Sequence, residues 1–214
     1  MQDRPDRAWL ESITPQWDRF LDPRHGGAVG RLMDVYYWKR VAISITVRRA
    51  VVYDGTSAAP RVFGDELPDE PPPPQAPPKN GGEARVDTGK VAAHLDRLPH
   101  SLLGWVGADA LPMVGRVRCH GISPRGLHLS TTDGPLPPGG RRAGLTAHAF
   151  RRHMVGQEQR VHTGWLDVVG DGTTYAPHTK AGYAMPGSRT LMTLASVVGM
   201  RLGHRKARQL GPTS

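Results

Sequence analysis

The chain has 214 residues, with 28 Lys and Arg, 19 Asp and Glu and a single cysteine, Cys119. This length suits one well-formed core, or one domain with an appendage, and one cysteine excludes both an internal disulfide and a cysteine-based zinc site. The charged start MQDRPDRAWL lacks the apolar segment of a secretory signal, and the most apolar stretch, Leu191 to Leu202, is too short to span a bilayer. These features predict a cytoplasmic protein without a membrane anchor.

The positive charge is confined to the C-terminal part of the chain. Residues 1–87 hold 12 Lys and Arg against 13 Asp and Glu, a net charge of −1, whereas residues 88–214 hold 16 against 6, a net charge of +10. Such an excess favours an anionic partner, which would be a phosphate-bearing cofactor, a nucleic acid or an acidic surface. The alternative is that the charge serves solubility alone.

The N-terminal part, residues 1–66, contains few elements. Residues 8–21 and 30–38 have partly helical patterns. Residues 41–53 read as a strand, because over residues 41–48 large apolar side chains alternate with small or polar ones, which is the period of a half-buried strand. Asp54 and Gly55 supply a turn after it. Because two short helices and a strand bury little surface, we expect this part to pack against the C-terminal domain or a partner subunit.

A proline-rich run follows, reading LPDEPPPPQAPPKNGG over residues 67–82. Proline has no backbone N–H to donate, and such runs prefer the extended polyproline II conformation. The sequence therefore predicts a semi-rigid linker over residues 67–87, between the N-terminal part and a domain that spans residues 88–214.

That C-terminal domain reads as mainly β. A helix is predicted from Thr88, taken as its N-cap, to about Leu98, where Pro99 ends it. Closely spaced strand-like runs separated by turn residues follow, which favours an antiparallel barrel or sandwich. A long final helix is predicted from Ser188 to about Leu210. The strand-like runs begin at Leu102, Pro112, Gly126, Arg142, Gln159 and Thr173.

The loop STTDGPLPPGGRR, from Ser130 to Arg142, is the most unusual segment for chemistry. Three hydroxyls leave one predicted strand and two arginines enter the next, and in an antiparallel pair these two ends would lie on the same edge of the barrel. Hydroxyls, glycine amides and a guanidinium fork are the groups that bind a phosphate. The alternative is a surface loop that only turns the chain. His128, His148 and His162 lie in predicted strands and could converge on one barrel face, but no metal-binding spacing accompanies them, and no metal site is predicted.

Residues 98–179 resemble the FMN-binding split β-barrel of the pyridoxamine 5′-phosphate oxidase-like superfamily. The resemblance rests on the order of LLGWVGADALPMVGRV, GLHLSTT with a following basic residue, and QRVHTGWLDVVGDG. It implies a split antiparallel β-barrel with flanking helices, a homodimer, and an FMN-dependent oxidoreductase in which the flavin supplies the redox chemistry.

Within this resemblance, Ser130, Thr131 and Thr132 would lie near the flavin, and Arg141 or Arg142 would hold its phosphate. A deazaflavin or a haem could replace FMN, because PLPPGGRR stands where the family has a helix. Two other functions stay open: a non-catalytic binding or assembly module on the same fold, and a basic nucleic-acid-binding protein. The last is disfavoured, since the basic residues are scattered and aromatic residues are few.

Overall fold

The structure, a computed structural model, describes residues 45–53, 60–131, 133–150, 156–188 and 191. Two compact units are distinguished, and the larger comprises residues 47–149 and 157–184. The helices predicted over residues 8–21 and 30–38, and all but the first residues of the predicted C-terminal helix, lie outside the described residues. None of the described helices is long and apolar enough to cross a membrane.

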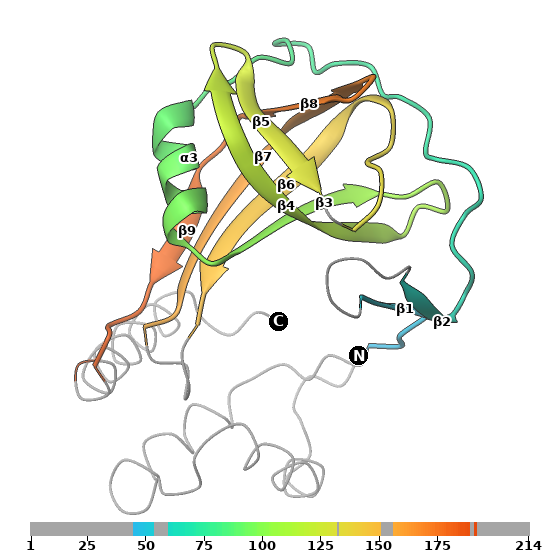
Figure 1. Ribbon diagram of the computed structural model, residues 1–214, viewed down its shortest axis with the longest axis horizontal. Coiled ribbons are helices and arrows are strands. Elements are labelled where there is room, and N and C mark those ends of the chain that lie inside the picture. Colours follow the sequence, from blue (N-terminus) through green and yellow to red (C-terminus); the bar gives the residue numbers. More distant parts are fainter. Residues whose placement is uncertain (1–44, 54–59, 132, 151–155, 189–190, 192–214) are drawn as a thin grey trace, which may run out of the picture. The chain divides into compact units, whose positions relative to one another are not determined.

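The larger unit is a closed antiparallel barrel of six strands (Figure 1). Neighbouring strands follow the order β6-β3-β4-β5-β8-β7, and pairing of β6 with β7 closes the ring. A short β9 (Ala181–Ala184) pairs with the first part of β7. The predicted mainly β, antiparallel fold is therefore confirmed. The six strands are β3 (His100–Val106), β4 (Pro112–Ser123), β5 (Gly126–Thr131), β6 (Gly139–Ala149), β7 (Glu158–Val169) and β8 (Gly172–Pro177).

The barrel interior is filled by side chains that alternate along the strands, as expected for a half-buried sheet. On β6, for example, Ala143, Leu145 and Ala147 are buried, whereas the residues between them are partly exposed. The largest side chains at the centre are fully buried, which makes the interior a packed core. They come from five strands: Leu103, Leu127, Leu145, Leu166 and Tyr175.

Helix α3 (Thr88–Arg97) contributes Val91 and Leu95 to this core. Its N-cap is Asp87, whose carboxylate accepts a hydrogen bond from the Lys90 amide, so the prediction of Thr88 as the cap was wrong by one residue. Aspartate is among the best N-cap residues because its oxygen satisfies a free amide of the first turn. Strands β5 and β8 pair over only two residues, and α3 packs against both and against β4.

Ahead of the barrel, β1 (Arg49–Val52) and β2 (Arg61–Gly64) form a separate two-stranded sheet. The strand predicted from Val41 is described only from residue 45, and it pairs from Arg49. Arg49 is almost fully buried, pairs with Asp109 in the β3–β4 turn and donates to the Met113 sulfur. Arg49 thus joins β1 to the β3–β4 turn of the barrel. The division at residues 66 and 87 stays a prediction.

Candidate functional site

The predicted phosphate loop leaves the end of β5. Ser130 is exposed, whereas Thr131 is half-buried and its hydroxyl accepts a hydrogen bond from the Asp133 amide, at 3.1 Å. Thr132 lies outside the described residues. Consecutive residues of a strand face opposite sides of the sheet, so the Ser130 and Thr131 hydroxyls do not act on the same side.

The two arginines that open β6 also point to opposite faces. Arg141 is only 1% exposed, whereas Arg142 is exposed. Strand β6 pairs with β3 and β7, and β5 pairs with β4 and β8. The expectation that hydroxyls and arginines meet across a pair of adjacent strands was therefore wrong, because the loop joins two strands that are not neighbours in the barrel.

The proline-rich segment 67–87, called the strap below, lies against the barrel (Figure 1, teal). Gln75 donates its amide to the Gly140 carbonyl at 2.7 Å, and its side-chain oxygen accepts from the Arg142 amide at 2.9 Å. Residues 139–142 pair with β7 but not with β3, so this edge of β6 is open to the strap. Between Pro71–Pro74 and Pro77–Pro78, only Gln75 and Ala76 have an N–H to offer.

Further contacts join the strap to β6, β7 and β8. The Trp165 ring lies between Gly82 of the strap and Gly140 of β6, so closely that a Cβ at either glycine would come within 2.9 Å of it. The Arg85 amide donates to the Pro177 carbonyl at 2.9 Å. Glycine is required at both contacts because any side chain would displace the indole.

Arg141 is held between the strap and the loop before β6. Its two terminal nitrogens both donate to the Pro72 carbonyl, at 3.2 and 3.1 Å, and one of them also donates to the Pro138 carbonyl at 2.6 Å. Its Nε is buried and has no hydrogen-bond partner among the described residues. Burial lowers the pKa of the guanidinium from its ordinary value.

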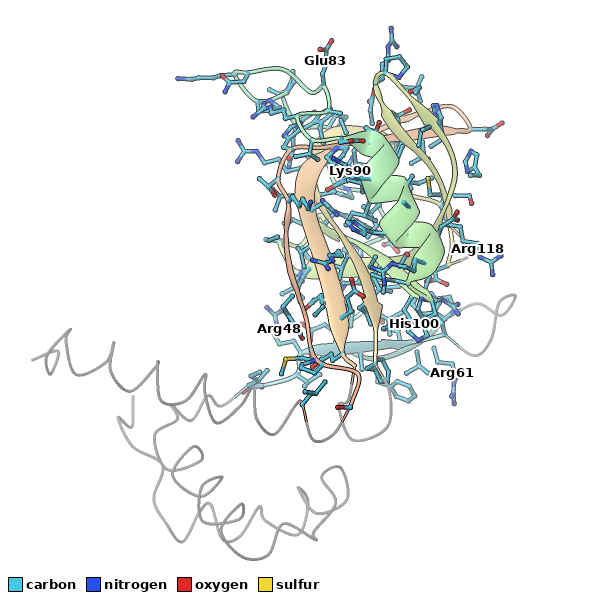
Figure 2. All side chains as sticks on the ribbon, turned by 90° about the vertical axis from the view of Figure 1, so that its left-hand side faces the viewer. Arg48, Arg61, Glu83, Lys90, His100 and Arg118 are labelled. Carbon is cyan, nitrogen blue, oxygen red and sulfur yellow. The ribbon has the colours of Figure 1, made fainter. Side chains whose placement is uncertain are left out.

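A basic surface lies on the opposite side of the ring of strands, on the outside of the β4–β5 hairpin. Residues 112–131 contain three arginines and two histidines but no Asp or Glu. Arg116 is neutralised by Asp133, with its Nε 2.7 Å from a carboxylate oxygen. Arg118 is exposed and points away from the barrel (Figure 2), and no ion pair to it occurs among the described residues.

Three polar neighbours surround Arg118 on this surface, which we call the hairpin face and define as Arg118, His120, His128 and Ser130. Ser130 lies opposite Arg118 in the β4–β5 register, and the rings of His120 and His128 are 6.2 Å apart. A bulge between Cys119 and Gly121 shifts the register here, and His120 within it is exposed. The face therefore combines a guanidinium, two imidazoles and a hydroxyl.

The histidines do not converge on one face as their strand positions suggested. His162 points into the barrel, whereas the rings of His128 and His148 lie next to those of His120 and His100. The expectation that they converge was therefore wrong. Among the described residues, no three His, Cys, Asp or Glu side chains are close enough together to hold a metal ion. The ring pairs are His120 with His128, His100 with His148 and His94 with His162.

The pair of His94 and His162 lies in a polar seam between α3 and β7. Arg97, one helical turn after His94, forms a two-point ion pair with Glu158 at 2.7 and 2.6 Å, and Arg160 binds the same carboxylate. His162 is 1% exposed, and its Nδ1 lies 3.0 Å from the Thr179 carbonyl. Its Nε2 and the Nδ1 of His94 are buried without partners among the described residues.

Burial is the largest cause that lowers the pKa of both His94 and His162 below the ordinary value. Nearby positive charge lowers both pKa values further, whereas at His162 the hydrogen bond with the Thr179 carbonyl opposes the shift. Their native forms therefore stay neutral at pH values where the unfolded chain takes up protons. We expect the free energy of unfolding to fall as the pH drops below about 6.5, by up to about 1.4 kcal/mol per pH unit for each histidine. Chemical denaturation between pH 7.5 and 5 measures this slope.

The matched variant for this prediction is His94→Gln with His162→Gln, which cannot titrate and should have a shallower slope. Glu158 does not interfere, because the Arg97 hydrogen bonds hold its pKa at about 2 and its contribution is lost only between about pH 4.5 and 2. An unchanged slope in the double variant would show that other groups control acid stability.

Comparison of the chain with known protein families, with characterised proteins and with solved structures finds no match. The proposed function therefore rests on the side chains of the barrel.

Proposed function

We propose that this protein is a non-catalytic binding module whose hairpin face takes a small ligand that bears phosphate groups. The observation that carries the proposal is Arg118, an exposed guanidinium on a twenty-residue hairpin without any acidic residue. A guanidinium that forms no ion pair keeps more of its attraction for an anion than one that is bound to a carboxylate. The Ser130 hydroxyl and the imidazoles of His120 and His128 add hydrogen-bonding groups beside it.

A small ligand is favoured over a nucleic acid by the composition of the same hairpin. Residues 112–131 contain no Phe, Tyr or Trp. Proteins that bind single strands without sequence preference stack bases on aromatic side chains, and the hairpin face has only its histidine rings for this purpose. Its positive charge is also concentrated on a few residues, which suits one or two phosphate groups.

The FMN-dependent oxidoreductase of the sequence resemblance stays a proposal beside this one, with FMN, a deazaflavin or a haem as its cofactor and a homodimer as its assembly. The closed antiparallel barrel is compatible with it, and FMN carries a phosphate of the kind that the hairpin face suits. The visible spectrum of the purified protein distinguishes the two: flavin absorption supports the oxidoreductase, and a Soret band indicates haem.

The binding proposal is tested with pyrophosphate and with FMN, titrated at low salt and followed by calorimetry. Arg118→Ser should weaken pyrophosphate binding about tenfold, because one charge-assisted contact to an exposed guanidinium is lost. The matched control is Arg142→Ser, which removes an exposed arginine from β6 and should leave the affinity unchanged.

Two outcomes would replace the proposal. If Arg142→Ser weakens binding and Arg118→Ser does not, the anion lies at the Ser130–Arg142 loop, as the sequence resemblance implied. If a twelve-nucleotide single strand binds more tightly than pyrophosphate and loses affinity steeply with salt, the function is nucleic-acid binding.

A further inference from the structure

Arg141 is the largest fully buried side chain in the described part of the barrel, and the proposed function does not use it. No carboxylate among the described residues pairs with it. Its hydrogen bonds go to two neutral carbonyls, of Pro72 and Pro138, and its Nε makes none. A buried charge is usually paired or fully hydrogen-bonded, because its removal from water is costly.

We propose that Arg141 is a second, latent oxyanion site, which the strap closes by placing the Pro72 carbonyl where a ligand oxygen would bind. Both terminal nitrogens of the guanidinium converge on this one oxygen, at 3.2 and 3.1 Å. The guanidinium fork suits the paired oxygens of a phosphate or carboxylate, and an ionised acceptor bonds it more strongly than a neutral carbonyl does.

The strap is built to be displaced without unfolding the barrel. Its polyproline stretch has no intrinsic hydrogen bonds to lose, and Gln75 alone supplies its two bonds to the β6 edge. Residues 139–142 keep their complete pairing with β7 when the strap leaves. Opening the strap therefore exposes the guanidinium while the sheet that positions it stays intact.

The ligand class follows from the shape and charge of the guanidinium fork. Inorganic phosphate and acetate present the two kinds of oxyanion that fit a single guanidinium. We expect phosphate to bind more tightly than acetate, because its additional oxygens can also reach the unpaired Nε.

The substitution Gln75→Pro tests whether the strap closes the Arg141 site. It removes both hydrogen bonds that Gln75 makes to the β6 edge yet retains the extended conformation that the neighbouring prolines impose. The matched control is Ala76→Pro, which adds a proline where the described structure shows no hydrogen bond of the amide. Both are made in the Arg118→Ser background, so that phosphate at the hairpin face does not contribute and the two proposals can fail separately.

Phosphate binding is followed by the rise in melting temperature and by the NMR resonance of the Arg141 Nε–H. Gln75→Pro should bind phosphate about tenfold more tightly than Ala76→Pro, since the open state is more populated, and phosphate should shift the Nε–H resonance. Arg141→Lys in the Gln75→Pro chain, which keeps the charge but loses the fork, should reverse the gain. Equal phosphate affinity in the two proline variants would overturn the proposal and would leave Arg141 with only a structural role, which is to hold the strap against the barrel.

Discussion

Replacing Gly164 by alanine is expected to destabilise the barrel by about 3 kcal/mol, because the strand has no room for a single methyl group. A Cβ at this position would overlap the Ala176 carbonyl oxygen and lie 2.9 Å from the Tyr175 hydroxyl. That hydroxyl is buried and donates to the His162 carbonyl at 2.8 Å, and the Ala143 carbonyl lies 3.3 Å from it. The methyl group would therefore push apart three strands at once.

Gly144→Ala is the matched control for this effect. Gly144 lies on the neighbouring strand β6, and a Cβ there would meet no atom within 4 Å. Because alanine restricts the unfolded chain more than glycine does, this variant should be neutral or slightly stabilising. Urea unfolding of both variants gives the comparison, and equal stability of the two would show that the packing around Tyr175 is looser than described.

Arg141→Ala is expected to cost about 3 kcal/mol of unfolding free energy, since it leaves a cavity and removes all three bonds that join the loop and the strap. Part of this loss is offset because a buried charge disappears. Arg141→Met fills most of the volume without the charge and should recover at least half of the loss. The comparison separates the packing contribution of the side chain from that of its hydrogen bonds.

In Arg141→Ala and Arg141→Met, we expect the contact between the strap and the β6 edge to open more often. Hydrogen exchange of the Gln75 and Arg142 amides should accelerate in both, because the Pro72 contact is gone in each case. If Arg141→Met is as unstable as Arg141→Ala, the hydrogen bonds dominate. If neither variant accelerates exchange at Gln75, the arginine does not hold the strap.

The strands were predictable because their apolar residues alternate with period two. All six predicted strand-like runs fall within or overlap β3 to β8, and glycines or prolines lie in the described turns after β4, β5 and β7. The helix over residues 88–97 was equally clear, since Pro99 follows its end. Local periodicity and turn chemistry therefore determine the elements of this fold.

The site could not be predicted to the same extent, because it depends on which strands become neighbours. The loop from Ser130 to Arg142 suggested that its two ends meet, but β5 and β6 do not pair. The alternation rule could have assigned Arg141 and Arg142 to opposite faces. The absence of acidic residues in 112–131 could also be read from the sequence. The contact of Gln75 with the β6 edge could not, because it joins residues that are far apart along the chain.

The most direct test of the hairpin face is an NMR titration of the isotope-labelled protein with pyrophosphate, followed at the backbone amides. We expect the largest shift changes at Arg118, His120, His128 and Ser130, with smaller ones along the rest of β4 and β5. Changes concentrated at residues 139–142, or no saturable changes at all, would contradict the proposal that this face binds the ligand.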